Sequence, residues 1–239
     1  MINNISALFD KSCKCLHCQT PFSTKRVRGG SLTMLSRDTD FCTRFKEQSL
    51  NPILYTVCVC PACGFAFTEQ FKSRLTAWEK QTVAEQIAAK WTPKNFGSVR
   101  KVPEAIVSYK LAIYAAELTD QPHSVKAGLY LRLAWLYRFL GKPEQELRFV
   151  NMAVGEYELS YVHSDYVRGE KEMSEVRLLY LIGELYRRLE KFDLAIKYFG
   201  KALAFRNVTI ESGVIRMAHD QWQLAREEYK AKQQTQKIG

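Results

Sequence analysis

The alternation of apolar and polar positions changes character along the chain. In the first 70 residues it is typical of short strands: two strands around a Gly29–Gly30 turn within residues 25–41, then a strand after Asn51–Pro52 that pairs with residues 64–71. After Pro103 the apolar residues recur at helical spacing, and glycines and prolines lie mainly between the periodic stretches. The pattern therefore predicts an α+β protein that is mostly α-helical.

Helix signals and turn-forming residues set the expected boundaries. Thr76 and Glu79 have the spacing of a capping box, which predicts a helix to about Lys90. The next stretch contains two prolines, a glycine and several polar residues, as linkers do. We therefore expect a β-rich domain with a trailing helix at 1–90, a linker at 91–102, a helical domain at 103–231 and a flexible tail at 232–239.

The helical part contains an internal repeat. Residues 130–154 and 180–203 align as helix–turn–helix units, and residues 104–118 match the second helix of such a unit. The aligned pairs are Gly183 with Ala134, Tyr186 with Tyr137, Phe199 with Val150 and Ala202 with Ala153. In this pattern, which is that of the tetratricopeptide repeat, small residues allow close helix contact and large ones fill the remaining space.

The repeat is longer than usual, because 49 residues separate Ala134 from Gly183 against about 34 in a standard unit. The surplus lies between Gly155 and Met173, which predicts an over-long second helix or an inserted loop. A last helix from about Glu211 to Lys230 carries an apolar stripe and is expected to cap the stack. The stripe consists of Val214, Ala218, Trp222, Ala225 and Tyr229.

Six of the seven cysteines form two tight groups, each with a C-x-x-C knuckle. In a knuckle two thiolates on a tight turn converge on one ion, and Gly64 provides the left-handed residue after the second turn. The two knuckles predict one structural zinc ion bound by Cys15, Cys18, Cys60 and Cys63, with no position left for water. We therefore expect a small β-rich, zinc-ribbon-like domain, followed by a tetratricopeptide-like α-helical repeat domain.

Other polar and thiol groups have weaker signals. Cys13 and Cys58 each precede a ligand by two residues, and we interpret them as packing cysteines, with additional ligation or redox pairing as the alternatives. Cys42 has no sequence partner. Asp38 and Asp40 are interpreted as turn-forming aspartates paired with arginines rather than as a ligand or anion site beside the zinc.

Composition places the chain among ordinary globular proteins, with 46% hydrophobic and 25% charged residues. We find neither an apolar run of membrane-spanning length nor a secretory signal, so we expect a soluble cytoplasmic protein without a membrane partner. The net charge of +10 is uneven: residues 1–102 carry 15 basic and 7 acidic side chains, and the remainder carries 20 and 18. The N-terminal domain is therefore mildly basic.

With both parts in view, the chain resembles a bacterial family known as domain of unknown function 2225. The resemblance covers nearly the whole chain and implies a zinc-ribbon-like N-terminus, a tetratricopeptide-like C-terminus and no established activity. The segments that carry it are CLHC at 15–18, RDTDFC at 37–42, NPILYTVCVCPACGFAF at 51–67, RLAWLYR at 132–138 and LIGELYRRL at 181–189.

The repeat pattern favours a non-enzymatic adaptor or scaffold whose concave groove binds an unidentified protein or peptide. First-helix positions line such grooves, and they correspond here to Leu131, Trp135, Arg138, Tyr180, Glu184 and Arg187. Arg138 and Arg187 would pair with carboxylates of the incoming segment. The alternative is that Trp135 and Tyr180 lie beneath the zinc domain or the C-terminal helix.

Two other functions compete with this one. In the first, the basic run Lys25, Arg26 and Arg28 binds nucleic acid, with Phe22 and Phe41 stacking on bases. In the second, the thiols sense oxidants and release zinc. An enzyme is not expected, because the four histidines are scattered and no phosphate loop or nucleophile elbow is found. The sequence specifies no oligomeric state.

Overall fold

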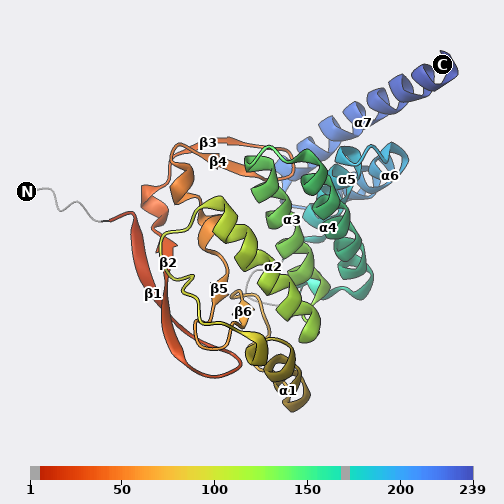
Figure 1. The fold of residues 1–239 in the computed structure, drawn as a ribbon. Helices are drawn as coiled ribbons and strands as arrows, with labels where there is room; N and C mark the ends of the chain where they lie inside the picture. The colour runs from red at the N-terminus through yellow and green to blue at the C-terminus, as the bar shows by residue number, and fades with distance from the viewer. Residues whose placement is uncertain (1–5, 168–172, 239) are drawn as a thin grey trace, which may run out of the picture.

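The computed structural model describes residues 6–167 and 173–238, which form a small β part beside a stack of helices (Figure 1). The strands form three antiparallel pairs: β1 (Leu8–Lys14) with β2 (Pro21–Val27), β3 (Met34–Arg37) with β4 (Thr43–Phe45), and β5 (Cys58–Val59) with β6 (Ala66–Phe67). The helices are α1 (Ala77–Gln86), α2 (Val102–Leu118), α3 (His123–Phe139), α4 (Pro143–His163), α5 (Glu175–Arg188), α6 (Phe192–Leu203) and α7 (Ser212–Ile238). The described chain is thus mostly helical with small strand pairs, as the periodicity predicts.

Strand pairing near the N-terminus differs from the prediction. β2 pairs with β1 across the first knuckle, whereas residues 29–31 form a 3-10 turn that leads toward β3. The cysteine turn closes this hairpin instead of the two glycines, because the amide of Cys15 donates to the carbonyl of Thr20 and extends the ladder. The single hairpin expected within residues 25–41 is therefore wrong: its two halves belong to different hairpins.

The strand expected after Asn51–Pro52 is also shorter than predicted. Residues 52–55 form a 3-10 turn, in which the Asn51 side chain accepts a hydrogen bond of 3.2 Å from the amide of Ile53. A capping side chain followed by proline favours a helical start over an extended one. Only β5 remains extended, and it pairs with β6, as expected for residues 64–71.

Helices α2 to α7 pack in chain order, each against the next. α4 continues for 21 residues, which corresponds to the over-long helix of the two alternatives, an over-long helix or an inserted loop, although it ends at His163 and residues 168–172 of the surplus stretch lie outside the described residues. α1 begins at the predicted capping box, where the amide of Glu79 donates to Thr76 and the Glu79 carboxylate accepts from the amide of Thr76. α7 projects from the stack and continues to Ile238, through the segment for which we expected a flexible tail (Figure 1).

The segment between α1 and α2, for which the sequence suggests a linker, is packed against the β part. Phe96 and Arg100 are buried, and the Arg100 guanidinium donates to the carbonyls of Val57 and Leu54 and to the hydroxyl of Thr24, at 2.7, 3.3 and 3.2 Å. α2 also contacts β5 and β6. The β part and the helical stack consequently share one continuous apolar core.

Two helical glycines give a matched test of this packing. A Cβ at Gly183 would lie 2.7 Å from the ring of Phe199, whereas a Cβ at Gly155 meets nothing within 4 Å. We expect Gly183→Ala to lower the free energy of unfolding by about 1–3 kcal/mol through overpacking. Gly155→Ala should raise it by up to about 1 kcal/mol, because alanine favours the helix. Urea denaturation measures both, and equal effects of the two substitutions would contradict the close α5–α6 contact.

Candidate functional site

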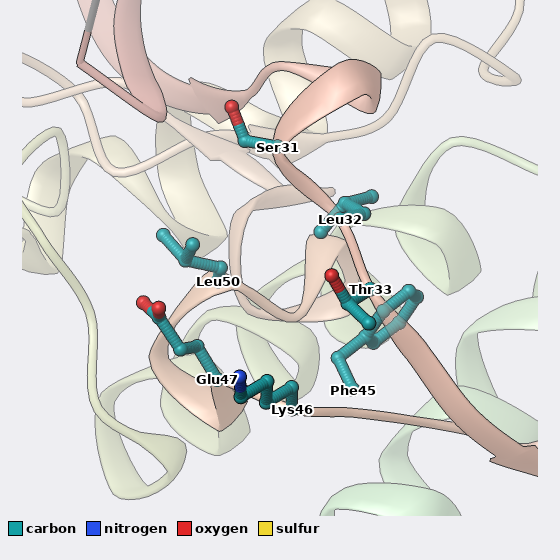
Figure 2. A pocket seen from close by; sticks show the side chains of 7 residues that line it. All are labelled: Ser31, Leu32, Thr33, Phe45, Lys46, Glu47 and Leu50. Carbon is teal, nitrogen blue, oxygen red and sulfur yellow. The ribbon is translucent and has the colours of Figure 1, made fainter. Parts of the chain in front are cut away.

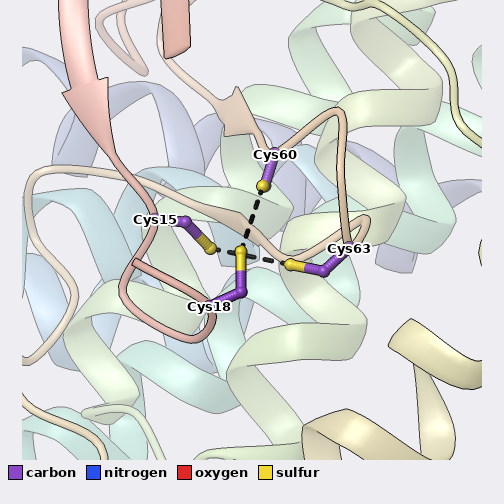
Figure 3. Close-up of side chains that lie close together, drawn as sticks. All are labelled: Cys15, Cys18, Cys60 and Cys63. Atoms are coloured by element: carbon purple, nitrogen blue, oxygen red, sulfur yellow. Dashed lines mark hydrogen bonds between the residues drawn. The ribbon is translucent and has the colours of Figure 1, made fainter. Parts of the chain in front are cut away.

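Four cysteine side chains from two turns meet at one point (Figure 3). Cys15 and Cys18 lie in the turn between β1 and β2, and Cys60 and Cys63 lie in the turn between β5 and β6. Their sulfur atoms all lie within 4.8 Å of one another, and the Cys15–Cys63 and Cys18–Cys60 pairs are each 3.6 Å apart. The predicted ligand set is thus brought together as a cluster that could hold a metal ion.

The two turns have the same backbone construction. In the first, the amide of Cys15 donates to Thr20 and the amide of Gln19 donates to Cys15, both at 3.1 Å. The equivalent bonds of the second turn, which begins at Cys60, are 3.0 and 2.9 Å long. Each turn ends in a left-handed residue, Gln19 with φ of 62° and Gly64 with φ of 74°. The left-handed position of Gly64 is predictable from its residue type, whereas that of Gln19 is not, because glutamine carries no conformational signal.

An aromatic side chain covers the second turn. The indole nitrogen of Trp91 donates to the carbonyl of Pro61 at 2.9 Å, and a Cβ at position 64 would lie 2.4 Å from the indole ring. Gly64 is therefore required twice, for its backbone conformation and for the space that Trp91 occupies. The sequence predicts a linker from Trp91, since nothing in it relates this residue to a turn about 30 residues earlier.

The cluster carries negative charge that a cation would neutralise. The hydrogen bond from Cys63, assisted by the turn amides, lowers the pKa of Cys15 to about 5 despite burial, and the same bond raises the pKa of Cys63. Sulfur pairs 3.6 Å apart are close to the roughly 3.8 Å edge of a tetrahedron with metal–sulfur bonds of about 2.3 Å. Donor type and spacing both fit a thiophilic metal ion.

A second polar centre joins the β part to the helices. The acidic segment, residues 38–41, lies at the turn of the β3–β4 hairpin, which reaches across to α3 and α5 (Figure 1). The Asp40 side chain is 0% exposed and accepts two hydrogen bonds from the Arg138 guanidinium, of 2.6 and 3.1 Å. The Trp135 indole donates to the same carboxylate at 3.1 Å, and Arg188 lies 3.5 Å from it. Asp40 is thus surrounded by donors from both helices.

The rest of the acidic segment is bound in the same way. Asp38 accepts from Arg138 at 2.7 Å, and the hydroxyl of Tyr180 donates to the backbone carbonyl of Thr39 at 2.7 Å. The Thr39 hydroxyl donates to the buried Glu184 at 2.5 Å. The Phe41 ring packs 5.5 Å from that of Tyr180. The backbone carbonyl, the hydroxyl, the carboxylates and the aromatic ring of this segment thus all contact side chains of α3 or α5.

The predicted groove residues therefore contact the chain itself. Trp135, Arg138, Tyr180 and Glu184 bind the acidic segment, while Leu131 is buried in the core. Arg187 pairs with Glu184 at 2.9 Å and with Glu228 of α7 at 3.1 Å. The aspartates form ion pairs, as interpreted from the sequence, but their arginine partners, Arg138 of α3 and Arg188 of α5, lie about 100 and 150 residues further along the chain. Local sequence holds no signal for such a pairing.

The basic run next to the first knuckle is also engaged within the chain. Lys25 pairs with Asp10 at 2.9 Å, and the Arg28 guanidinium lies 4.8 Å from the centre of the Phe9 ring. Phe22 packs edge-on against Phe67 at 6.3 Å. The groups named for nucleic-acid contact thus have protein partners in this structure.

A small cavity lies at the open end of the β3–β4 hairpin (Figure 2). Its volume is about 30 Å³, which accommodates one or two water molecules rather than an organic ligand. It is lined by Ser31, Leu32, Thr33, Phe45, Lys46, Glu47 and Leu50. The cysteine cluster and the acidic segment, rather than this cavity, are the sites with defined chemistry.

The buried Asp40 makes stability depend on pH. Burial alone would raise the pKa of Asp40, but hydrogen bonds from Arg138 and the charge of Arg188 outweigh it and hold the pKa below its ordinary value. The stabilisation is therefore complete above the unfolded-state pKa of about 3.9 and is lost as the pH falls through the lower folded-state pKa. We expect Asp40→Asn to cost about 3 kcal/mol at pH 7, because it breaks a buried pair.

Urea denaturation between pH 3 and pH 7 measures this difference. The difference in the free energy of unfolding between the natural protein and Asp40→Asn should be constant above about pH 5 and should become smaller below about pH 4. Asp10→Asn is the matched control, since Asp10 is exposed and its bond to Lys25 should contribute about 0–1 kcal/mol. A gap that does not narrow in acid would contradict the depressed pKa.

Comparison with known proteins identifies a family but supplies no activity. Within residues 6–167 and 173–238, no helix is both long and apolar enough to cross a membrane. No curated protein matches the chain. A family model described as an uncharacterized protein conserved in bacteria, DUF2225, matches residues 8–225, which is most of the chain and confirms the resemblance seen in its motifs. The protein therefore belongs to the DUF2225 family of uncharacterized bacterial proteins.

Proposed function

We propose that this protein is a non-enzymatic, zinc-stabilised interaction module whose tetratricopeptide-like helical surface binds an acidic peptide segment of a partner protein. One observation carries the proposal: the faces of α3 and α5 already bind an acidic segment in a tight turn, the chain's own residues 38–41. A partner segment with the same groups would compete for this surface. The cytoplasm is the expected location, because reduced cysteines are the form that binds zinc.

The contacts define what such a partner must present. The Arg138 guanidinium receives a carboxylate through two bonds, which selects Asp or Glu over neutral side chains. The Tyr180 hydroxyl donates to the backbone carbonyl of Thr39, which lies inside a turn closed by the bond from the amide of Phe41 to the carbonyl of Asp38, so the bound segment must form a turn at that point. The Glu184 carboxylate accepts a hydroxyl between the two acidic positions. The matching partner motif is therefore acidic–hydroxyl–acidic, as in Asp38–Thr39–Asp40.

Zinc has a structural role in this proposal, with Cys15, Cys18, Cys60 and Cys63 as its ligands. Four thiolates and no open position correspond to a structural rather than a catalytic site. Binding of Cys18 and Cys60 to one ion would also close the stretch of chain that contains residues 38–41. Loop closure lowers the entropic cost of placing that segment against the helices. Metal binding would therefore favour the placement of residues 38–41 on the helical surface.

Metal analysis tests the zinc assignment. Protein purified under reducing conditions should contain one zinc ion per chain, with a dissociation constant of about 1 nM or tighter, as structural zinc sites show. Cys60→Ser should lose the metal, because it removes one of the four ligands. Cys42→Ala is the matched control: Cys42 is buried outside the cluster and should leave the zinc content unchanged. A zinc-free protein that keeps its fold in chelator would refute a structural zinc.

A peptide added in trans tests the docking surface. We expect a fluorescent peptide of residues 36–42, with serine at position 42, to bind Asp40→Asn protein with micromolar affinity and the natural protein at least tenfold more weakly, because the latter's own segment competes. A peptide with asparagines at both acidic positions should bind at least tenfold more weakly, since each charged hydrogen bond contributes about 1.5–3 kcal/mol. Fluorescence anisotropy measures these affinities.

The receptor controls separate specific docking from misfolding. Circular dichroism at pH 7 verifies that Asp40→Asn remains folded, and Arg138→Met in the same background should abolish binding of the acidic peptide. Arg187→Glu is a poorer probe, because Arg187 also ties α5 to α7 through Glu228. Equal affinities for the acidic peptide and for the peptide with two asparagines would contradict the proposed recognition.

A further inference from the structure

Two cysteines outside the metal cluster lie in contact. The sulfur of Cys13 on β1 is 3.4 Å from the sulfur of Cys58 on β5, although 45 residues separate them. The inner face of the β1–β2 hairpin packs here on the β5–β6 hairpin, where Phe22, the strand partner of Cys13, meets Phe67, the strand partner of Cys58. Packing from both sides therefore holds the two sulfurs together.

The surroundings differ for the two thiols. Cys13 is partly exposed, so a small oxidant can reach it, whereas Cys58 is 2% exposed. The guanidinium of Arg26 donates to the sulfur of Cys58 at 3.4 Å and to the carbonyl of Thr56 at 3.2 Å. An accessible thiol in contact with a buried one can react with a small oxidant and then be resolved by its neighbour.

We propose that Cys13 and Cys58 form a redox-active dithiol that hydroperoxides oxidise to a disulfide, while the neighbouring zinc site keeps its metal. Cys13 attacks the peroxide oxygen and becomes a sulfenic acid, and the peroxide leaves as water or an alcohol. Cys58 then attacks the Cys13 sulfur, and the hydroxyl group leaves as water. Two thiols lose two electrons and two protons, and one peroxide bond is reduced. The sulfurs need to approach from 3.4 Å to about 2.05 Å.

The position of this pair determines its consequence. Each cysteine precedes a knuckle by two residues, Cys13 before Cys15 and Cys58 before Cys60. A disulfide there joins the same two arms of the chain that the metal joins. The oxidised protein would thus hold its β part together by a covalent bond as well as by zinc. Of the metal ligands Cys18 is exposed, and coordination to the ion reduces the reactivity of its thiolate.

Mild oxidation of the zinc-loaded protein tests the proposal. After treatment with one to two equivalents of hydrogen peroxide, the intact mass should fall by two hydrogens, and non-reducing digestion with fragmentation should link Cys13 to Cys58. Zinc measured with a chromogenic chelator should stay bound. The oxidised protein should then keep its near-ultraviolet circular dichroism in excess chelator, whereas the reduced protein loses it.

Three variants complete the experiment. Cys13→Ser and Cys58→Ser should each abolish the mass change and the resistance to chelator, and Cys42→Ala should preserve both. Zinc release with disulfides among Cys15, Cys18, Cys60 and Cys63 would overturn the proposal in favour of a metal-ejecting sensor. A sulfinic acid on Cys13 without a link to Cys58 would overturn it as well. None of these outcomes depends on the proposed peptide surface, so the two hypotheses fail separately.

Discussion

One buried carboxylate connects the two parts of this protein. Asp40 is fully removed from solvent at the tip of the β3–β4 hairpin, where Arg138 and Trp135 of α3 and Arg188 of α5 surround it. An isolated charge in such a place would be strongly destabilising, so hairpin and helices must meet correctly for either to be stable there. The ion pair thereby fixes the register between a small β part and a helical stack, which the apolar core alone would define less sharply.

The cysteine cluster adds a second constraint on the same stretch of chain. Cys18 and Cys60 meet at one point, so the residues between them leave the cluster and return to it, with the acidic segment near the middle of that path. Arg100 and Trp91 also hold this region in place, because they donate hydrogen bonds to the carbonyls of Val57 and Pro61. The strands of the β part span only two to seven residues, so their hydrogen-bond ladders are short. The β part therefore needs these additional contacts to be stable.

Features that depend on local spacing can be predicted from the sequence. Two C-x-x-C turns, the capping box at Thr76 and a long α4 are all encoded within a few dozen residues, and the structure has each of them. Contacts with distant partners could not be predicted, such as Trp91 over Gly64 and Arg138 around Asp40. The pairing of β1 with β2 is local, but the expected Gly29–Gly30 turn concealed it, because the cysteine turn closes the hairpin instead. A segment such as RDTDFC shows that charges are concentrated, but not which helix will neutralise them.

The same contacts imply how selective the proposed surface would be. A neutral segment would leave Arg138 and Arg188 without their buried carboxylate, and an unpaired buried charge costs more than an ordinary lost hydrogen bond. The chain's own segment is also tethered, and a short tether corresponds to an effective concentration of roughly millimolar order. A competing partner would therefore need to bind at several points, or to bind when the loop closed by the cysteine cluster has opened. In the proposed function, selectivity for carboxylates and slow exchange would have one cause, which is the burial of Asp40 between arginines of two helices.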